Sequence, residues 1–246
     1  MTKNILVAGF LAIGILPLTA RASLITGELN FTGSATISLD SVAFNNGNIF
    51  NIGPAGMQQG GFMALGGTAG SIGNITNPPY ATGVIFPTPD FMTFAAAPNI
   101  SIRLLEVLPG TDGAAGCADT PAASGQACTP TTPGESQFNL QNTSATSSTA
   151  SFAIFGDEDD SLTGTSSSIT GTFTIPLTTE NFQTLLAIVN GGGEITAPFS
   201  GQILIATPAA VTPEPATLID LLIGGIGGLG LYVSRDGQRT KTDYRA

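Results

Sequence analysis

The chain carries the sequence ITGTFTIPL at residues 169–177, with an apolar residue or glycine at every odd position. The sequence ITAPFSGQILI at residues 195–205 alternates in the same way. A period of two is typical of a β-strand that buries one face, because successive side chains point to opposite sides. These two segments predict two half-buried strands close together in the chain.

The segment between them has a different period. Apolar residues at 182, 185, 186 and 189 follow the i, i+3, i+4, i+7 spacing of an amphipathic helix. Thr178 or Thr179 is a candidate cap, and Asn190-Gly191 is a typical stop signal. We expect one short helix here.

Upstream, similar alternation predicts further strands. Residues 25–39 form a long strand or a hairpin bent near Gly33, and Asn45 to Asn48 is a turn signal. Shorter strands are expected at residues 49–52, 100–107, 137–140 and 150–155. Many strands and one helix predict a mainly β domain over residues 23–206, an antiparallel sandwich or jelly-roll-like fold.

Residues 1–22 have the features of a signal peptide. Lys3 precedes an apolar run from Ile5 to Leu18, and Ala20-Arg21-Ala22 places small residues at the spacing that signal peptidase recognises. We expect cleavage after Ala22.

The C-terminal part of the chain has three features in a fixed order. Pro213-Glu214-Pro215 follows a short linker at 207–212 and precedes an apolar, glycine-rich run at 216–233. Residues 234–246 then carry four cationic side chains. An 18-residue run is close to the length that spans a bilayer as a helix, and basic residues favour the cytoplasmic side.

This order resembles the PEP-CTERM sorting signal of Gram-negative bacteria, over about residues 211–246. The resemblance implies export, a tether in the inner membrane that leaves the domain in the periplasm, and processing by an exosortase. It implies delivery to the cell surface or the extracellular matrix, and a role linked to exopolysaccharide or biofilm. It implies no activity for the domain.

Composition excludes several functions for the exported part. Arg103 is the only basic residue between Ser23 and Val211, against thirteen acidic ones. Nucleic acid is therefore excluded as a partner, because phosphate neutralisation needs lysine and arginine. The chain has no histidine, which removes Ser-His-Asp and Cys-His catalysis and the usual zinc sites. It also has no tryptophan and three tyrosines, so aromatic platforms are scarce. We expect a protein that is not an enzyme.

Two cysteines, Cys117 and Cys128, form an even pair in a chain expected to be exported. We predict a disulfide between them, which would close a loop of about 12 residues and stabilise the fold by roughly 3 kcal/mol. It would lie within an irregular loop expected at residues 109–133.

The acidic run Asp157, Glu158, Asp159 and Asp160 is the densest charge in the chain. Coming after the strand predicted at 150–155, it is expected at the top of a hairpin. Clustered carboxylates suit calcium, although the spacing matches no EF-hand. Two interpretations follow: a solvated turn, and a calcium-dependent binding module as the alternative function.

The predicted leader makes a direct test. N-terminal sequencing of the exported protein should begin at Ser23, because signal peptidase cuts after the second small residue of Ala20-Arg21-Ala22. An exported protein that still begins at Met1 would contradict the signal-peptide assignment.

Overall fold

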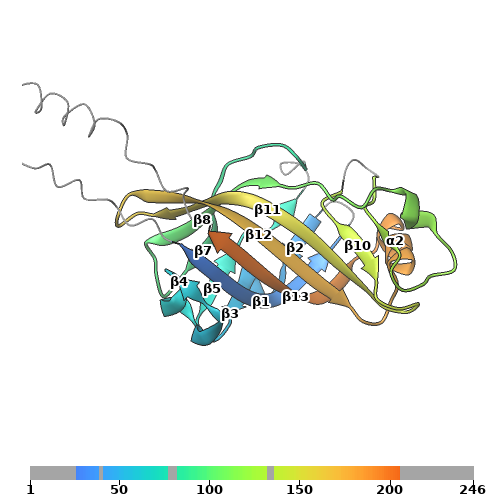
Figure 1. Cartoon of the computed structure of the whole chain (residues 1–246), viewed down its shortest axis with the longest axis horizontal. Helices are drawn as coiled ribbons and strands as arrows, with labels where there is room; N and C mark the ends of the chain where they lie inside the picture. Colours follow the sequence, from blue (N-terminus) through green and yellow to red (C-terminus); the bar gives the residue numbers. More distant parts are fainter. Residues whose placement is uncertain (1–25, 39–40, 77–81, 132–135, 206–246) are drawn as a thin grey trace, which may run out of the picture. The chain divides into compact units, whose positions relative to one another are not determined.

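The computed structural model describes residues 26–38, 41–76, 82–131 and 136–205. These ranges are almost entirely strand and loop (Figure 1). The strands are β1 (Gly27–Ile37), β2 (Ser41–Phe44), β3 (Ile49–Ile52), β4 (Gln59–Gly60), β5 (Ala69–Ile72), β6 (Ile75–Thr76), β7 (Thr88–Phe94), β8 (Ile100–Val107), β9 (Ala127–Cys128), β10 (Asn139–Asn142), β11 (Ser148–Asp160), β12 (Thr165–Leu177) and β13 (Ile195–Ile205). The helices are α1 (Asn45–Asn48), α2 (Phe182–Asn190) and the 3-10 turns η1 (Ala55–Met57), η2 (Met63–Leu65) and η3 (Ala115–Ala118).

Eight of the strands close into an antiparallel barrel. Strands β1, β3, β5, β7, β8, β11, β12 and β13 each pair with the next in chain order. The ring is completed by β13, which pairs with β1 from Gly27↔Ile205 to Ile37↔Ile195. The remaining strands are short additions: β2 and β4 pair with β1, β6 with β2, β10 with β11, and β9 with β10.

The mainly β, antiparallel prediction with one short amphipathic helix is confirmed, but the sandwich or jelly-roll arrangement is wrong. A jelly roll needs strands that cross between two sheets, whereas neighbours in this barrel follow the order of the chain. Alternation shows which side of a strand is buried and cannot show whether the sheet closes. The predicted membrane span at 216–233 lies outside the described residues, and no helix within them is long and apolar enough to cross a membrane.

Several local predictions hold. Within the segment predicted at 25–39, Gly27–Ile37 form one continuous strand, β1, and Asn45 to Asn48 is a turn with left-handed φ at Asn46, Gly47 and Asn48. The predicted helix is α2, but its cap is Asn181, whose side chain accepts a hydrogen bond from the Thr184 amide. The N-cap is therefore the residue directly before Phe182, and the predicted caps Thr178 and Thr179 lie further upstream.

Phenylalanine rings fill the barrel. Phe173 stacks on Phe152 at 4.6 Å and lies 5.5 Å from Phe31, measured between ring centroids. Phe31 in turn lies 5.0 Å from Phe50, and Phe50 lies 6.1 Å from Phe94. All five are at most 2% exposed. In a barrel of eight strands the interior is just wide enough to be filled by side chains, and these rings fill it.

Glycine faces phenylalanine across the interior side of the wall. Gly33 pairs with Phe199, Gly201 pairs with Phe31, and Gly70 pairs with Phe50. A Cβ at Gly201 would lie 2.3 Å from the Phe31 ring, and one at Gly33 would lie 2.6 Å from the Phe199 ring. The rings therefore lie over the backbone of the glycines, which lets large side chains share a narrow interior.

Replacing Gly201 with alanine should destabilise the barrel by about 1–3 kcal/mol, since the added methyl overpacks the Phe31 ring. Denaturant unfolding of the purified protein measures the change. Gly56→Ala is the matched control, because a Cβ there meets nothing within 4 Å. Equal stabilities of the two variants would contradict the packing role assigned to Gly201.

Candidate functional site

The acidic run does not lie in a turn. Asp157 to Asp160 are the last four residues of strand β11, and the turn to β12 follows at 161–164. The hairpin was predicted correctly, but the position of the run within it was wrong. The inward parity of Phe152 and Ile154 could have shown this, because continuing it places Glu158 and Asp160 inside as well.

Asp157 and Asp159 point outward and share one cation. Arg103 on the neighbouring strand β8 donates from Nη2 to Asp157 Oδ2 at 2.8 Å. Its Nε lies 3.7 Å from Asp159 Oδ2. The only basic residue between 23 and 211 is therefore held against two of the four carboxylates, on a partly exposed surface.

Glu158 points inward and is fully buried. Among the described residues neither carboxylate oxygen has a hydrogen-bond partner, and the same is true of Oγ of Ser167, which lies directly opposite Glu158 on β12. On the other side Glu158 pairs with the apolar Ile102 of β8. Burial, followed by the nearby charges of Asp160 and Asp159, raises the pKa of Glu158 to about 7.

Asp160 also points inward, but it is fully partnered. It accepts hydrogen bonds from Asn99 Nδ2 at 2.8 Å, from the Leu162 amide at 2.9 Å and from Thr163 Oγ1 at 2.9 Å. These bonds, that of Asn99 first, lower the pKa of Asp160 below its ordinary value. The side chain closes the turn between β11 and β12.

The four carboxylates predicted as calcium ligands are thus divided between two faces of one strand. In this arrangement they cannot converge on one ion, and among the described residues no three acidic, cysteine or histidine side chains are grouped to hold a metal. Calcium binding stays a prediction for a titration to test.

Cys117 and Cys128 form the predicted disulfide, with their Cα atoms 5.1 Å apart. Cys117 lies in η3, and Cys128 lies in β9, which pairs with β10 at Leu140. Cys128 is completely buried and belongs to the apolar core. The disulfide therefore links the irregular loop to the apolar core of the domain.

A buried amide ties the same region to α2. Asn142 at the end of β10 accepts a hydrogen bond from the Phe182 amide at 2.9 Å, and its Nδ2 donates to Gln126 and Gln183. The Phe182 amide is one of the helix N-terminal donors that lack an intrahelical partner. Asn142 thus has a structural role that the sequence analysis did not identify.

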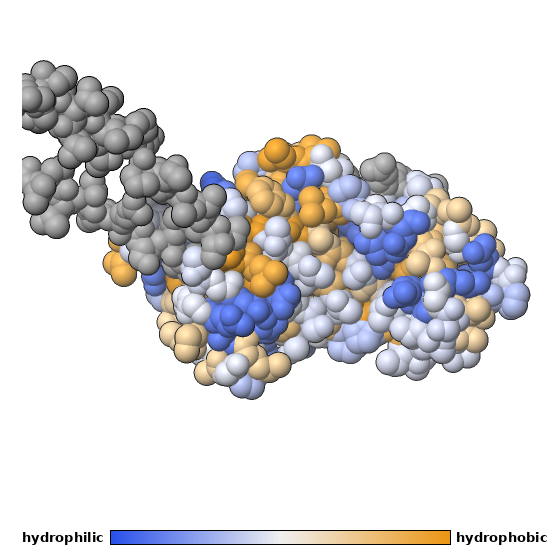
Figure 2. All heavy atoms as spheres, in the orientation of Figure 1, coloured by the Kyte–Doolittle hydropathy of each residue, from blue (hydrophilic) through white to orange (hydrophobic). Residues whose placement is uncertain are grey.

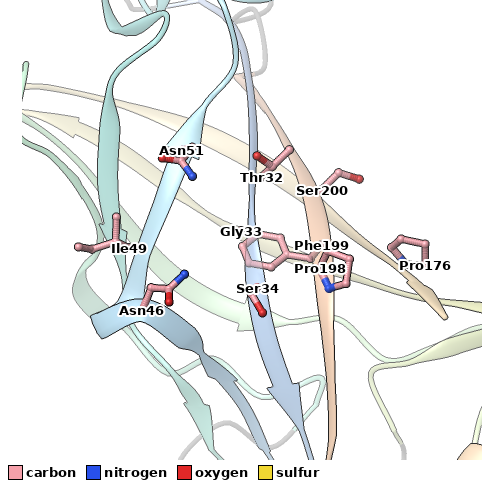
Figure 3. A pocket seen from close by; sticks show the side chains of 10 residues that line it. All are labelled: Thr32, Gly33, Ser34, Asn46, Ile49, Asn51, Pro176, Pro198, Phe199 and Ser200. Carbon is pink, nitrogen blue, oxygen red and sulfur yellow. The ribbon is translucent and has the colours of Figure 1, made fainter. Parts of the chain in front are cut away.

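The outer wall has a groove of about 460 Å³ (Figure 3). Residues from α1, β1, β3, β12 and β13 line it, and none of those described is ionisable: Thr32, Gly33, Ser34, Asn46, Ile49, Asn51, Pro176, Pro198, Phe199 and Ser200. The sequence analysis did not identify it. Figure 2 shows mostly pale residues of intermediate hydropathy in the middle of the visible face.

Two prolines explain why the wall opens there. The β12–β13 ladder runs from Ile169↔Ile205 to Thr174↔Ser200 and then stops. Pro176 and Pro198 lie two residues further along their strands, both exposed. Proline has no amide hydrogen to donate, which favours an end to the pairing between β12 and β13 here. On its other side each proline stays aligned with a neighbour, Pro176 with Thr149 of β11 and Pro198 with Ser34 of β1. A proline in each of two adjacent strands was the sequence signal for this opening.

The residues of the predicted sorting signal, Pro213, Glu214 and Pro215, lie outside the described residues, as does the predicted signal peptide at 1–22. No protein-family model, curated protein or solved structure matches the chain.

The buried carboxyl of Glu158 predicts a pH-dependent stability. The folded-state pKa of about 7 lies above the ordinary value of 4.5, so the folded protein holds this proton more tightly than the unfolded chain. The free energy of unfolding should consequently fall as the pH rises from about 4.5 to about 7.

Glu158→Gln should remove that fall, since the amide has no charge to bury. At pH 8 the variant should be more stable than the unmodified protein by up to about 3 kcal/mol, and at pH 4.5 nearly equal to it. Denaturant unfolding at several pH values measures this, with Glu106→Gln on the outer side of β8 as the control. Parallel pH profiles for Glu158→Gln and the unmodified protein would refute the assignment.

Proposed function

We propose that this chain is an exported protein of the cell envelope or extracellular matrix, without enzymatic activity, delivered by an exosortase and associated with exopolysaccharide. Signal peptidase removes residues 1–22. The domain is held in the periplasm by the span at 216–233 until the exosortase processes it, and it is then released to the cell surface or beyond.

One observation carries the proposal: Pro213-Glu214-Pro215 stands directly before an apolar run of membrane length and a basic segment. Two prolines fix φ and remove backbone donors, which favours an extended conformation of such a motif over a helical one. An extended segment beside the membrane is the form that proteases bind. Glu214 adds one charge for recognition.

The domain is consistent with this role. Its core is a cluster of phenylalanine and aliphatic side chains rather than a chamber for a substrate. Its disulfide suits an oxidising compartment outside the cytoplasm. The outward-facing residues of β12 are mostly serine and threonine, namely Ser166, Ser168, Thr170, Thr172 and Thr174, which makes this face of the wall polar with few charges.

The alternative is a calcium-dependent binding module acting through residues 157–160. Titration with calcium, followed by the melting temperature, separates the two functions. A large upward shift at sub-millimolar calcium would favour the binding module, and an unchanged melting temperature favours the structural role.

The sorting motif provides the main test. In a host that carries the matching exosortase, Glu214→Ala and Pro215→Ala should each leave the protein full-length and retained in the inner membrane, because the enzyme loses its recognition segment. Leu222→Ile, within the span, is the matched control and should be processed normally. Cell fractionation and immunoblotting measure both outcomes. Motif variants that are processed and released like the unmodified protein would show that the motif is only a linker.

A further inference from the structure

We propose that the groove on the outer wall binds a segment of a neutral polysaccharide. The proposal rests on the association with exopolysaccharide above and deepens it, by naming the site and the class of polymer.

One side of the groove presents polar groups in a row. The register aligns Ser200 of β13 with Thr32 of β1, and Thr32 with Asn51 of β3. All three side chains are exposed on the outer face (Figure 3). Neighbouring strands are about 4.8 Å apart, so the row presents hydroxyl and amide groups at regular intervals.

These groups are available to a ligand. The side chains of Ser200, Thr32 and Asn51 make no hydrogen bond to another described residue. On the same strands, by contrast, Thr36 and Thr196 bond to each other at 2.8 Å. An oligosaccharide supplies both donors and acceptors through its hydroxyls, and can therefore satisfy a mixed row of this kind.

The other side of the groove carries apolar groups, the exposed rings of Pro176 and Pro198 and the side chain of Ile49, which is 50% exposed. Two polar residues, Ser34 and Asn46, line the groove beside them. A sugar has an apolar C–H face and a rim of hydroxyls. Placed over the prolines, it would meet apolar surface with the face and the polar row with the rim.

The lack of ionisable residues among those described in the groove favours a neutral polymer. None of the ten described residues that line the groove is ionisable, so neither an anionic nor a cationic ligand finds a counter-charge there. The thirteen acidic residues of the exported part further disfavour an anionic polymer such as a uronate.

A peptide fits the groove less well. Peptides commonly add as a strand to an open sheet edge through their main chain. Over the groove, β1 is paired on both sides, with β13 and with β3, and β3 is paired with both β1 and β5. The edges of β12 and β13 that are not paired with each other at the groove carry Pro176 and Pro198, which have no amide hydrogen to donate to an added strand. The ligand is therefore held mainly by side chains, which suits weak binding repeated along a polymer.

Affinity gel electrophoresis tests the site with the full-length chain in non-ionic detergent. Gels contain a neutral glucan, mannan or galactan, and a separate gel contains anionic alginate. At least one neutral polymer should retard the protein, and alginate should retard it less.

The double variant Thr32→Ala/Ser200→Ala should weaken binding to that polymer by about tenfold, the equivalent of one to two ordinary hydrogen bonds. Ser166→Ala/Thr170→Ala is the matched control, because both residues are exposed on β12 away from the groove. Melting temperatures equal to that of the unmodified protein establish that both variants fold.

Three results would overturn the site: no retardation by any neutral polymer, stronger retardation by alginate, or equal binding by the two double variants. A protein that is sorted normally but binds no polymer overturns this inference alone. One that binds a neutral polymer but is not processed at its motif overturns the proposed sorting instead.

Discussion

The interior of an eight-stranded barrel is narrow, and everything else in this domain follows from how it is filled. Phe173 lies at the centre of the packing, in contact with the rings of Phe31, Phe152 and Phe199. Such rings fit only where the opposing residue is small. Gly33 and Gly201 provide that space through their pairing with Phe199 and Phe31. Glycine weakens a strand in isolation, but here the aromatic ring covers it and recovers the lost contact area.

The ladder between β12 and β13 covers only part of both strands. Pro176 and Pro198 have no amide hydrogen, so the ladder between β12 and β13 ends before them. The end of this ladder also opens the groove on the outer wall. The groove therefore depends on two prolines, a residue that is rare inside paired strands.

The acidic strand end shows how burial separates chemically similar groups. Asp157 and Asp159 stay outside and share Arg103, whereas Glu158 lies inside between Ile102 and Ser167, with no hydrogen-bond partner among the described residues. A buried carboxyl without hydrogen bonds is costly when ionised, so Glu158 favours its neutral form until near neutral pH. The period-two alternation of the strand therefore decides which of these three adjacent carboxylates lie outside beside Arg103 and which one is buried.

Alternation in the sequence was enough to predict the long strands β1, β8, β12 and β13, because a period of two directly reflects one buried face. The helix spacing at 182–189 and the even pair of cysteines were equally direct signals. The closure of the sheet into a barrel was not predictable, because β1 and β13 lie far apart in the sequence and alternation does not show which strands pair. The division of residues 157–160 was missed because a run of charges suggested a turn, and the apolar interior that buries Glu158 is built from strands distant in sequence. The groove likewise needs β1, β3 and β13 side by side, and register between distant strands is set by packing of the whole core rather than by any one segment.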